Sequence, residues 1–430
     1  RQKVLNIMSN ERSGFSSRLG FVLATAGSAV GLGNIWRFPY LAAKYGGGTF
    51  LLTYLILTLT FGFSLMITEV ALGRKAGTSA IRAFGHFSKK HTFIGYLTTI
   101  IPFIIFPYYC VIGGWVTKYA LVSLQGGIHN AASDTFFTGF ISKSAEPMIC
   151  VLVFLIATTV VVAGGVKGGV ERVSTIMMPV LIVLLIGVSL FCITRPGAMA
   201  GVAYYLKPSL KGFGPTTILA ALGQLFYSMS LAMGIMITFG SYMPKKADLE
   251  KSVTQVEIFD TGVAFLAGLM IVPAVFVFSN GDSSMLAKGP SLMFVMLPKV
   301  FNSMAFSSVI AAVFFILVLL AALTSSISLL ETLVAVLMDK FHMKRGTACI
   351  TMFIIALLLA VPSSLGFGAW SNITILGFDF LDFFDFISNS VLMPIAAFLT
   401  CLFVGYIIKP KVIVDEVESS GEFKRKSLSV

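Results

Sequence analysis

Apolar residues in this chain occur in ten long runs that are separated by short polar connectors. A run of about 20 apolar residues is long enough for a helix to cross the hydrocarbon core of a bilayer. The runs predict ten spans, at 15–40, 46–73, 92–123, 147–163, 170–193, 215–243, 252–279, 307–338, 346–366 and 382–408. We therefore expect an all-α polytopic membrane protein in contact with membrane lipid.

Lysine and arginine orient these spans. With the N-terminus in the cytoplasm, the predicted inner segments hold 22 of the 31 Lys and Arg residues. Cytoplasmic loops carry such an excess of positive charge in membrane proteins. We therefore expect both ends of this chain in the cytoplasm, with 1–14 as an N-terminal segment and 409–430 as a tail. The basic residues at 424–426 would equally suit the flank of a further span.

Two of the predicted spans contain small and polar residues where a continuous helix would be apolar. The first carries Gly27, Gly31 and Gly33, and each glycine lowers helix propensity by about 1 kcal/mol relative to alanine. The sixth carries the stretch 227–234, with two serines and a glycine. One such stretch alone would indicate close helix packing. Two of them predict helices that unwind in mid-membrane, where only protein or a water-filled cavity can satisfy the freed backbone groups.

The positions of the two breaks indicate how the spans are organised. Each break lies in the first helix of a group of five, and an odd number of spans per group inverts the second group relative to the first. We expect a first five-helix repeat at 15–193, an outer connector at 194–214 and a second, inverted repeat at 215–408. Inverted repeats with broken helices are typical of secondary transporters, which bind substrate and ions near the midplane.

Composition agrees with this class and excludes others. Hydrophobic residues make up 57% of the 430 residues, charged residues make up 12%, and the mean hydropathy is +0.92. The net charge is +12, but the basic residues lie in separate connectors rather than in one patch, so we expect no nucleic-acid partner. The five cysteines include no CxxC pair, and we expect neither a zinc site nor a disulfide framework.

Four motifs resemble one known family. They are GSAVGLGNIWRFP at 27–39, three glycines at 46–48, Glu69 followed by Gly-Arg at 73–74, and Thr-Ser-Ser at 324–326. Together they are similar to prokaryotic members of the neurotransmitter:sodium symporter family, which includes a bacterial leucine transporter. The resemblance implies sodium-coupled import by alternating access in the cell membrane of a prokaryote, with two bound sodium ions and a substrate at the midplane. Because two cations would move with a zwitterion, uptake is expected to be electrogenic.

Gly31 indicates the class of substrate that the resemblance implies. Family members that carry monoamines have an aspartate at this position, whereas members that carry amino acids have glycine. The N–H groups of Leu32 and Gly33 and the hydroxyl of Tyr109 would hold the carboxylate. The implied substrate site consists of Ala29, Gly31, Leu32, Gly33, Ile105, Tyr109, Tyr227, Ser228, Ser230, Met233, Ser325 and Leu329.

The implied pocket carries no fixed charge, so we expect a hydrophobic amino acid as substrate. Two departures from the leucine transporter affect the expected size of this substrate. The chain has Ala232-Met233-Gly234 where that transporter has Gly-Phe-Gly, and Tyr227 where it has a phenylalanine lid. Methionine adapts to larger side chains, including aromatic ones. Ala232 would stiffen the unwound stretch.

The resemblance also implies two sodium sites made of oxygen ligands, as hard cations require. The first would use the carbonyl of Ala29, the side chains of Asn34 and Ser228, and one oxygen of the substrate carboxylate. The second would use the carbonyls of Gly27, Val30 and Ala321 with the hydroxyls of Thr324 and Ser325. A substrate oxygen shared with the first ion would couple the binding of the two ligands.

Asp260 leaves two alternatives open. It would either occupy the position where animal members of the family place chloride, or replace an asparagine that ligates the first sodium ion. In both cases a fixed negative charge lies beside Na⁺, so we expect transport without chloride. Glu331 replaces a glutamine of the leucine transporter, and the sequence assigns it no role.

The remaining implied roles concern access to the site. Arg37 and Asp385 match an outer gate pair, and Arg12, Tyr242 and Asp339 match an inner gate. Glu69 matches a scaffold residue that bonds the open backbone of the broken helices. Gly169 and Pro179 match the positions between which the fifth span unwinds to admit water.

Two other classes of function remain to be compared with a transporter. Residues 77–80 with His86 nearby form the only nucleophile-like signal, but a second elbow glycine and an HExxH motif are missing, so we expect no enzyme. A membrane sensor that binds an amino acid without turnover remains an alternative, because only flux separates it from a carrier. The sequence gives no indication of the oligomeric state.

Overall fold

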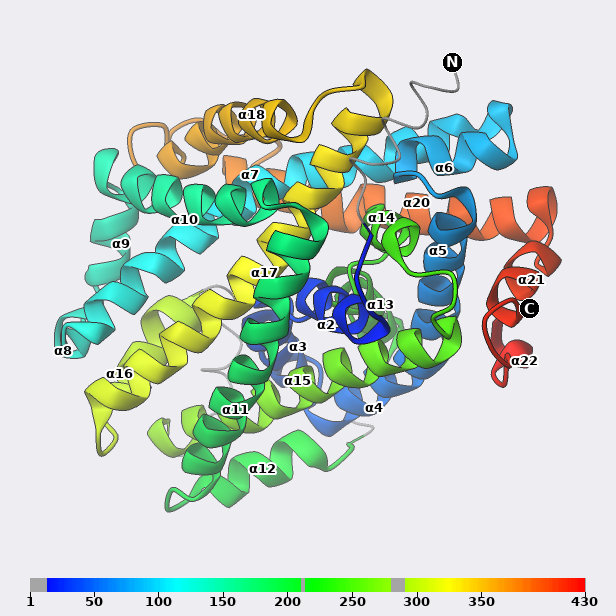
Figure 1. The fold of residues 1–430 in the computed structure, drawn as a ribbon. Helices are drawn as coiled ribbons and strands as arrows, with labels where there is room; N and C mark the ends of the chain where they lie inside the picture. The colour runs from blue at the N-terminus through cyan, green and yellow to red at the C-terminus, as the bar shows by residue number, and fades with distance from the viewer. Residues whose placement is uncertain (1–13, 210–212, 280–290, 430) are drawn as a thin grey trace.

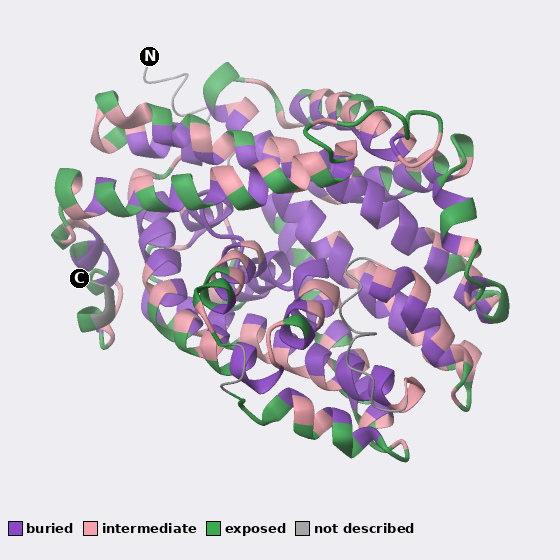
Figure 2. Cartoon of the chain, turned by 180° about the vertical axis from the view of Figure 1, so that it is seen from behind, coloured by how far each residue is buried: buried purple, intermediate pink, exposed green. Residues whose placement is uncertain are grey.

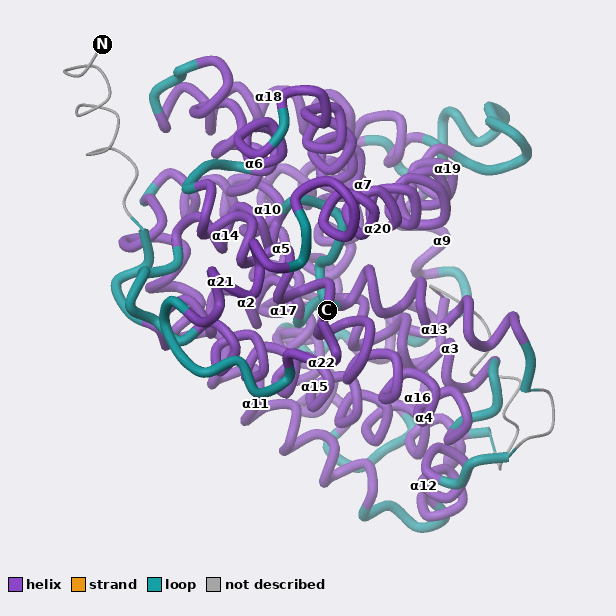
Figure 3. Tube along the Cα trace, turned by 90° about the vertical axis from the view of Figure 1, so that its right-hand side faces the viewer, coloured by secondary structure: helices purple, strands orange, loops and turns teal. Residues whose placement is uncertain are grey.

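The computed structural model describes residues 14–209, 213–279 and 291–429, and these ranges contain helices but no strands (Figures 1 and 3). The α-helices of the first half are α2 (Arg18–Ala29), α3 (Phe38–Lys44), α4 (Gly48–Leu57), α5 (Phe63–Ala76), α6 (Ala80–Phe87), α7 (Thr92–Leu124), α8 (Ile128–Ala131), α9 (Phe136–Ile141), α10 (Ala145–Ala163), α11 (Arg172–Ile193) and α12 (Ala198–Leu206). Those of the second half are α13 (Pro215–Ser228), α14 (Ile235–Tyr242), α15 (Leu249–Phe278), α16 (Leu297–Asn302), α17 (Ser307–Phe341), α18 (Arg345–Leu365), α19 (Phe380–Asp385), α20 (Met393–Leu402), α21 (Lys411–Glu418) and α22 (Lys426–Ser429).

Short π-helical turns join several of these helices into longer spans. Within the described residues, eight spans are long and apolar enough to cross a membrane: Gly48–Ala76, Lys89–Leu124, Ala145–Ala163, Val166–Ile193, Leu249–Phe278, Ser307–Phe341, Arg345–Leu365 and Phe380–Ile408. The first predicted span is a broken pair, Arg18–Ala29 and Gly33–Lys44, bent by 51°. The sixth consists of α13 and α14 with non-helical backbone between them. The predicted all-α membrane fold with breaks in the first and sixth spans is confirmed.

The broken helices lie at the centre of the molecule. Figure 1 shows α2 at the centre, in contact with α15 and α17, and α14 beside α5. Buried positions concentrate in this centre, whereas the outer helices carry exposed positions along one face (Figure 2). Val160 of α10, Val183 of α11 and Leu358 of α18 are 65–68% exposed. Apolar side chains in that position face lipid in a membrane protein, so the polar site lies at the centre and the apolar face outside.

Local signals fix several helix ends. The side chain of Ser17 caps α2 by accepting from the N–H of Gly20, and Asp248 caps α15 by accepting from the N–H of Lys251. The second span ends at Gly77, whose φ of 63° is left-handed and suits glycine. These residues therefore set where α2, α5 and α15 begin or end.

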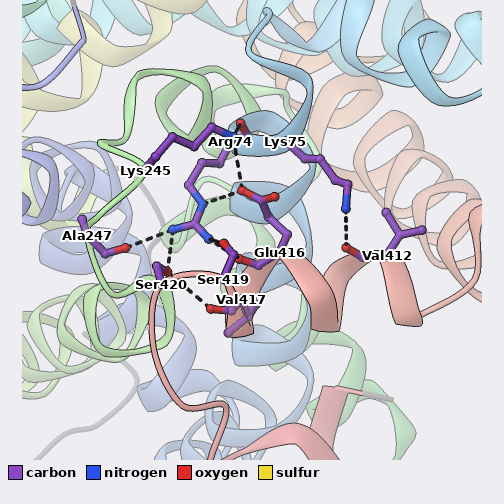
Figure 4. A network of polar contacts seen from close by, with 9 residues as sticks. All are labelled: Arg74, Lys75, Lys245, Ala247, Val412, Glu416, Val417, Ser419 and Ser420. Carbon is purple, nitrogen blue, oxygen red and sulfur yellow. Dashed lines mark hydrogen bonds and ion pairs between the residues drawn. The ribbon is translucent and has the colours of Figure 1, made fainter.

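The segment after the last span folds back onto the inner end of α5 (Figure 4). Arg74 is fully buried there, and its Nε lies 2.8 Å from Oε1 of Glu416 in α21. Its Nη1 donates to the carbonyl of Ala247 at 3.0 Å and to Oγ of Ser420 at 2.9 Å. Lys245 reaches the same Glu416 carboxylate at 3.4 Å. The predicted tail is therefore part of the packed structure in its described portion.

A second cluster holds the end of this segment. The guanidinium of Arg425 bonds Glu257 of α15 at 2.7 Å and lies 3.5 Å from the ring centre of Phe63. The backbone N–H groups of Lys424 and Arg425 donate to the two oxygens of Glu250 at 2.7 and 2.9 Å. The segment thus connects the inner ends of the second and seventh spans.

We predict that Glu416→Gln destabilises the protein by about 3 kcal/mol, because removing one partner of a buried ion pair leaves the other charge uncompensated. Glu418→Gln is the matched control: it removes an ion pair with Lys426 in which both side chains are about half exposed. That change should cost less than about 1 kcal/mol. Thermal unfolding of the purified variants in one detergent measures the difference. Equal melting temperatures for the two variants would contradict the prediction.

Candidate functional site

The break in the first span lies between α2 and the π-helical turn Gly33–Arg37. Val30 leaves the helix with extended backbone, and the N–H of Gly31 donates to Oδ1 of Asn34 at 3.1 Å. A Cβ on Gly31 would lie 2.4 Å from Oγ of Ser325, so a larger residue here would displace that hydroxyl. The break is therefore closed by a side-chain amide and by contact with α17.

The break in the sixth span uses left-handed backbone. Ser230, Ala232 and Gly234 have φ values of 52°, 62° and 72°. A non-glycine residue in this region costs roughly 1–2 kcal/mol, so Ala232 is strained where glycine would not be. The N–H of Ala232 donates to Oε1 of the fully buried Glu69 at 2.9 Å. Glu69 thus lies where the sequence predicted a scaffold for the open backbone.

A single cavity of about 30 Å³ lies between the two breaks. All twelve residues predicted for the substrate site line it, and no charged side chain does. Ser28 and Ile235 line it as well, which the sequence did not predict. The cavity is polar at the break in the first span, where the hydroxyl of Tyr109 accepts from the N–H of Leu32 at 3.5 Å. Further hydroxyl groups come from Ser228 and Ser230 at the second break and from Ser325 of α17, whereas Ile105, Met233, Ile235 and Leu329 form an apolar part of the wall.

Asp260 of α15 is the centre of a polar cluster beside this cavity. Its Oδ1 accepts from Nδ2 of Asn34 at 2.7 Å and from Oγ of Ser228 at 2.8 Å. Its Oδ2 accepts from the hydroxyl of Tyr54 at 3.1 Å. All three donors are neutral, and Asp260 is fully buried. A buried carboxylate with only neutral partners lacks a compensating charge, which favours a cation at this place.

A second group of oxygens lies on the other side of the first break. Oγ1 of Thr324 is 3.5 Å from the carbonyl of Val30 and 3.0 Å from that of Ala321. Oγ of Ser325 is 3.5 Å from the carbonyl of Gly27 and 3.3 Å from that of Val30. All five residues predicted for the second sodium site therefore converge.

A second, larger cavity of about 530 Å³ lies next to the first, and Tyr227 lines both cavities. The predicted gate residues Arg37 and Asp385 line this larger cavity, but they form no ion pair with each other. Arg37 instead stacks 5.0 Å from the ring centre of Tyr227. Asp385 accepts from the hydroxyl of Tyr108 at 3.2 Å and from Nδ2 of Asn389 at 2.5 Å. Tyr227 thus lies between the small cavity and the larger one.

The opposite side is closed by packed and paired residues. The hydroxyl of Tyr242 donates to Oε1 of Glu331 at 2.8 Å, and the other carboxylate oxygen pairs with Arg345. The ring of Phe15 packs against Tyr242, and the N–H of Phe15 donates to the backbone carbonyl of Tyr242 at 3.0 Å. The predicted gate residue Asp339 accepts from the N–H of Ser79 at 2.7 Å. Arg12, the remaining predicted inner-gate residue, lies outside the described residues.

Comparisons with known proteins agree with this architecture. The model of the sodium:neurotransmitter symporter family matches residues 12–139 and 135–429. An uncharacterized sodium-dependent transporter of Bacillus subtilis, YhdH, is 36% identical over 412 residues, which cover 95% of this chain and 90% of that protein. One from Methanocaldococcus jannaschii is 33% identical over 430 residues, covering 96% and 86%. The chain belongs to the sodium:neurotransmitter symporter family.

A solved structure extends this likeness to three dimensions. The crystal structure of MhsT in complex with L-phenylalanine has a TM-score of 0.89 to this chain at 38% identity, covering 97% of this chain and 95% of that one. This symporter-family member is therefore a membrane transporter rather than an enzyme, as predicted, and its relatives are named sodium-dependent.

Four residues of the site in this family member were not predicted from its sequence. Tyr54 and Gln224 support the first break, since Tyr54 bonds Asp260 and Nε2 of Gln224 donates to the carbonyl of Gly33 at 2.9 Å. Ser28 and Ile235 line the cavity. A buried tyrosine or glutamine in an apolar span needs a polar partner. This requirement was the feature of the sequence from which Tyr54 and Gln224 could have been predicted. The sequence could not say which partner it would meet.

The fifth span is wound through both residues at which the sequence predicted unwinding. Gly169 lies in the π-helical turn Val166–Glu171, and Pro179 lies inside α11. The turn ends at Glu171, which accepts from the N–H of Ser16 at 2.8 Å and from its hydroxyl at 2.5 Å. The chain entering the first span is thus attached to the fifth span beside Gly169.

Gly20→Ala should break this attachment, because its Cβ would lie 1.8 Å from Oε1 of Glu171. Hydrogen bonds to a charged group contribute about 1.5–3 kcal/mol each, so we expect a loss of about 2 kcal/mol and faster amide exchange at 14–20. Gly187→Ala in α11 is the control, since nothing lies within 4 Å of its Cβ position. Melting temperature and hydrogen–deuterium exchange measure the effect. Unchanged exchange in the first variant would contradict it.

Proposed function

We propose that this chain is a symporter that imports a hydrophobic amino acid together with sodium by alternating access. The observation that carries the proposal is one central cavity between two broken helices, lined by backbone and hydroxyl groups at the breaks and by a cluster of apolar side chains, with no charged side chain in its lining. A zwitterion with an apolar side chain matches this distribution, whereas acidic and basic amino acids would bury an unpaired charge.

The carboxylate of the substrate would bind at the break in the first span. The N–H groups of Leu32 and Gly33 lie at the start of the second half-helix, where the helix dipole favours an anion. The hydroxyl of Tyr109 is a further donor beside Leu32. A side chain at Gly31 would crowd the hydroxyls of Ser325 and Tyr109, so glycine keeps these two groups in place beside the carboxylate position.

The side chain of the substrate would lie against Ile105, Met233, Ile235 and Leu329, which line the same cavity. Methionine adapts to ligands of different shape and makes favourable contacts with aromatic rings. The structural relative MhsT is solved in complex with L-phenylalanine, which makes this amino acid the first candidate. The cavity of about 30 Å³ is smaller than this side chain, so its walls would have to move apart on binding.

The first sodium ion would bind Asp260, Asn34, Ser228 and the carbonyl of Ala29, together with one substrate oxygen. The ion would supply the positive charge that the neutral partners of Asp260 do not. Of the two alternatives for Asp260, its bonds to Asn34 and Ser228 favour a direct sodium ligand, while its bond to Tyr54 is compatible with the chloride position. With a carboxylate at either place, chloride would not be required.

The second sodium ion would bind the carbonyls of Gly27, Val30 and Ala321 and the hydroxyls of Thr324 and Ser325. This set joins α2 to α17, so the ion would hold the broken span against a long continuous one. Two cations moving with a zwitterion carry net charge inwards. Each elementary charge moved across 100 mV supplies about 2.3 kcal/mol, which is enough to drive accumulation.

Access would alternate between the outer vestibule at Arg37 and Asp385 and the inner closure at Tyr242, Glu331 and Arg345. Arg12 and Asp339 would contribute to the inner gate, and unwinding of the fifth span between Gly169 and Pro179 would open a path for water. The excess of Lys and Arg on the inner connectors supports a cytoplasmic location for both ends of this chain.

Uptake into proteoliposomes tests the proposal. An inward sodium gradient should drive accumulation of labelled L-phenylalanine, an inside-negative potential should increase it, and replacing chloride by gluconate should leave it unchanged. Accumulation of equal size without a sodium gradient would contradict symport. Sodium-dependent stabilisation by the amino acid without any accumulation would identify the alternative, a sensor without turnover.

Asp260→Asn should weaken sodium binding at the first site by at least about tenfold, since a charged ligand is replaced by a neutral one. The sodium concentration needed for stabilisation by L-phenylalanine reports this change. Asp382→Asn is the control, because this carboxylate lines the outer vestibule instead of the cluster. A wild-type sodium dependence in Asp260→Asn would exclude Asp260 as a ligand.

A further inference from the structure

A separate cavity of about 440 Å³ lies at the inner end of the molecule, between α6, the start of α7 and the end of α17. Its lining includes Arg82 and His86 of α6 and Lys340 of α17, together with the hydroxyl residues Thr78 and Thr92. None of these residues belongs to the substrate or sodium sites. The cavity therefore has a chemistry of its own, with basic groups from two sides and hydroxyl groups between them.

The basic groups of this cavity are not neutralised by neighbouring carboxylates. Arg82 and His86 are exposed and form no ion pair with any described residue. Asp339 is the adjacent carboxylate in the chain, but it does not line the cavity and accepts from the N–H of Ser79 at 2.7 Å. Oγ1 of Thr78 is buried and has no hydrogen-bond partner among the described residues. An anion with several oxygens would suit such a set of donors.

The surroundings of the cavity indicate its depth in the membrane. Phe93 and Tyr96 of α7 are 52% and 46% exposed, and the hydroxyl of Tyr96 accepts from Nζ of Lys340 at 2.6 Å. Exposed aromatic residues beside basic ones mark the level of the lipid headgroups. Helix α6 buries Ile81 and Phe84 and exposes Arg82 and His86, and Figure 1 shows it at the edge of the molecule beside α7. This is the arrangement of an interfacial helix.

We propose that this cavity binds the phosphate headgroup of an anionic phospholipid from the cytoplasmic leaflet. Basic pockets between membrane helices on the cytoplasmic side bind such headgroups. A bound headgroup would link α6 to α17. The first residue of α6, Ala80, lies against Gly234 at the break in the sixth span, so the lipid would stabilise the support of the central site. The inference depends on the inward orientation of α6 and not on which substrate is carried.

Lipid binding by two matched double variants tests the proposal. In Arg82→Gln with Lys340→Gln, both basic groups of the cavity are removed. In Lys89→Gln with Lys90→Gln, the same charge is removed from exposed residues that do not line it. Phosphatidylglycerol is titrated into delipidated protein in detergent, with phosphatidylcholine as the neutral reference. Native mass spectrometry counts retained lipid, and the melting temperature reports stabilisation.

Phosphatidylglycerol should be retained by the wild type in preference to phosphatidylcholine and should raise its melting temperature. Each basic group near the surface contributes about a fivefold gain in affinity, so the cavity variant should bind roughly 25-fold more weakly. The control variant should change less than about threefold. Equal losses in the two variants would show that surface charge alone attracts the lipid, and an unchanged cavity variant would also overturn the proposal.

Two further measurements complete the test. Arg82→Gln alone changes an exposed side chain without partners, so it keeps the test valid if the double variant fails to fold, with an expected loss of about fivefold. Inorganic phosphate is added to delipidated protein in a parallel titration. Full stabilisation by phosphate, with no further effect of phosphatidylglycerol, would replace the lipid by a free anion and overturn the assignment.

Discussion

Backbone polar groups that are freed inside a membrane must find partners within the protein, and the centre of this structure is organised by that constraint. The two broken spans expose N–H and C=O groups at the midplane. Asn34 closes the first break, and Glu69 holds the N–H of Ala232 in the second. The hydroxyls of α17 face the carbonyls at the end of α2. Backbone and hydroxyl groups at both breaks also line one small cavity, which is where we propose that the substrate binds.

Two buried carboxylates near this centre have opposite environments. Glu331 pairs with Arg345 and accepts from Tyr242, so its charge is compensated inside the protein and it closes the inner side. Asp260 meets only neutral donors. A compensated buried charge holds elements together, whereas an uncompensated one attracts a mobile cation. The same chemical group is therefore compensated by the protein at one position, whereas at the other it is available to the sodium ion that we propose.

The end of the molecule where the segment after the last span packs is held mainly by charged groups, whereas the exposed faces of the outer helices are apolar. Arg74 with Glu416 and Arg425 with Glu257 attach the segment after the last span to the second and seventh spans. Glu171 attaches the start of the first span to the fifth. These contacts join residues of different spans, so any movement of the spans relative to one another at this end would have to break them.

The sequence by itself determined the spans, the two breaks and, through the family motifs, twelve of the residues that line the central cavity, because hydrophobic length, glycine content and motifs are local properties. It also identified Glu69 and the oxygen groups around α17. Only the tertiary structure decided which distant residues meet. Tyr54 and Gln224 joined the site, Glu331 acquired Arg345 as its partner, and Arg37 stacked on Tyr227 instead of pairing with Asp385. These contacts join residues far apart in the chain, and the packing angles of the helices that bring them together are not written in any local pattern.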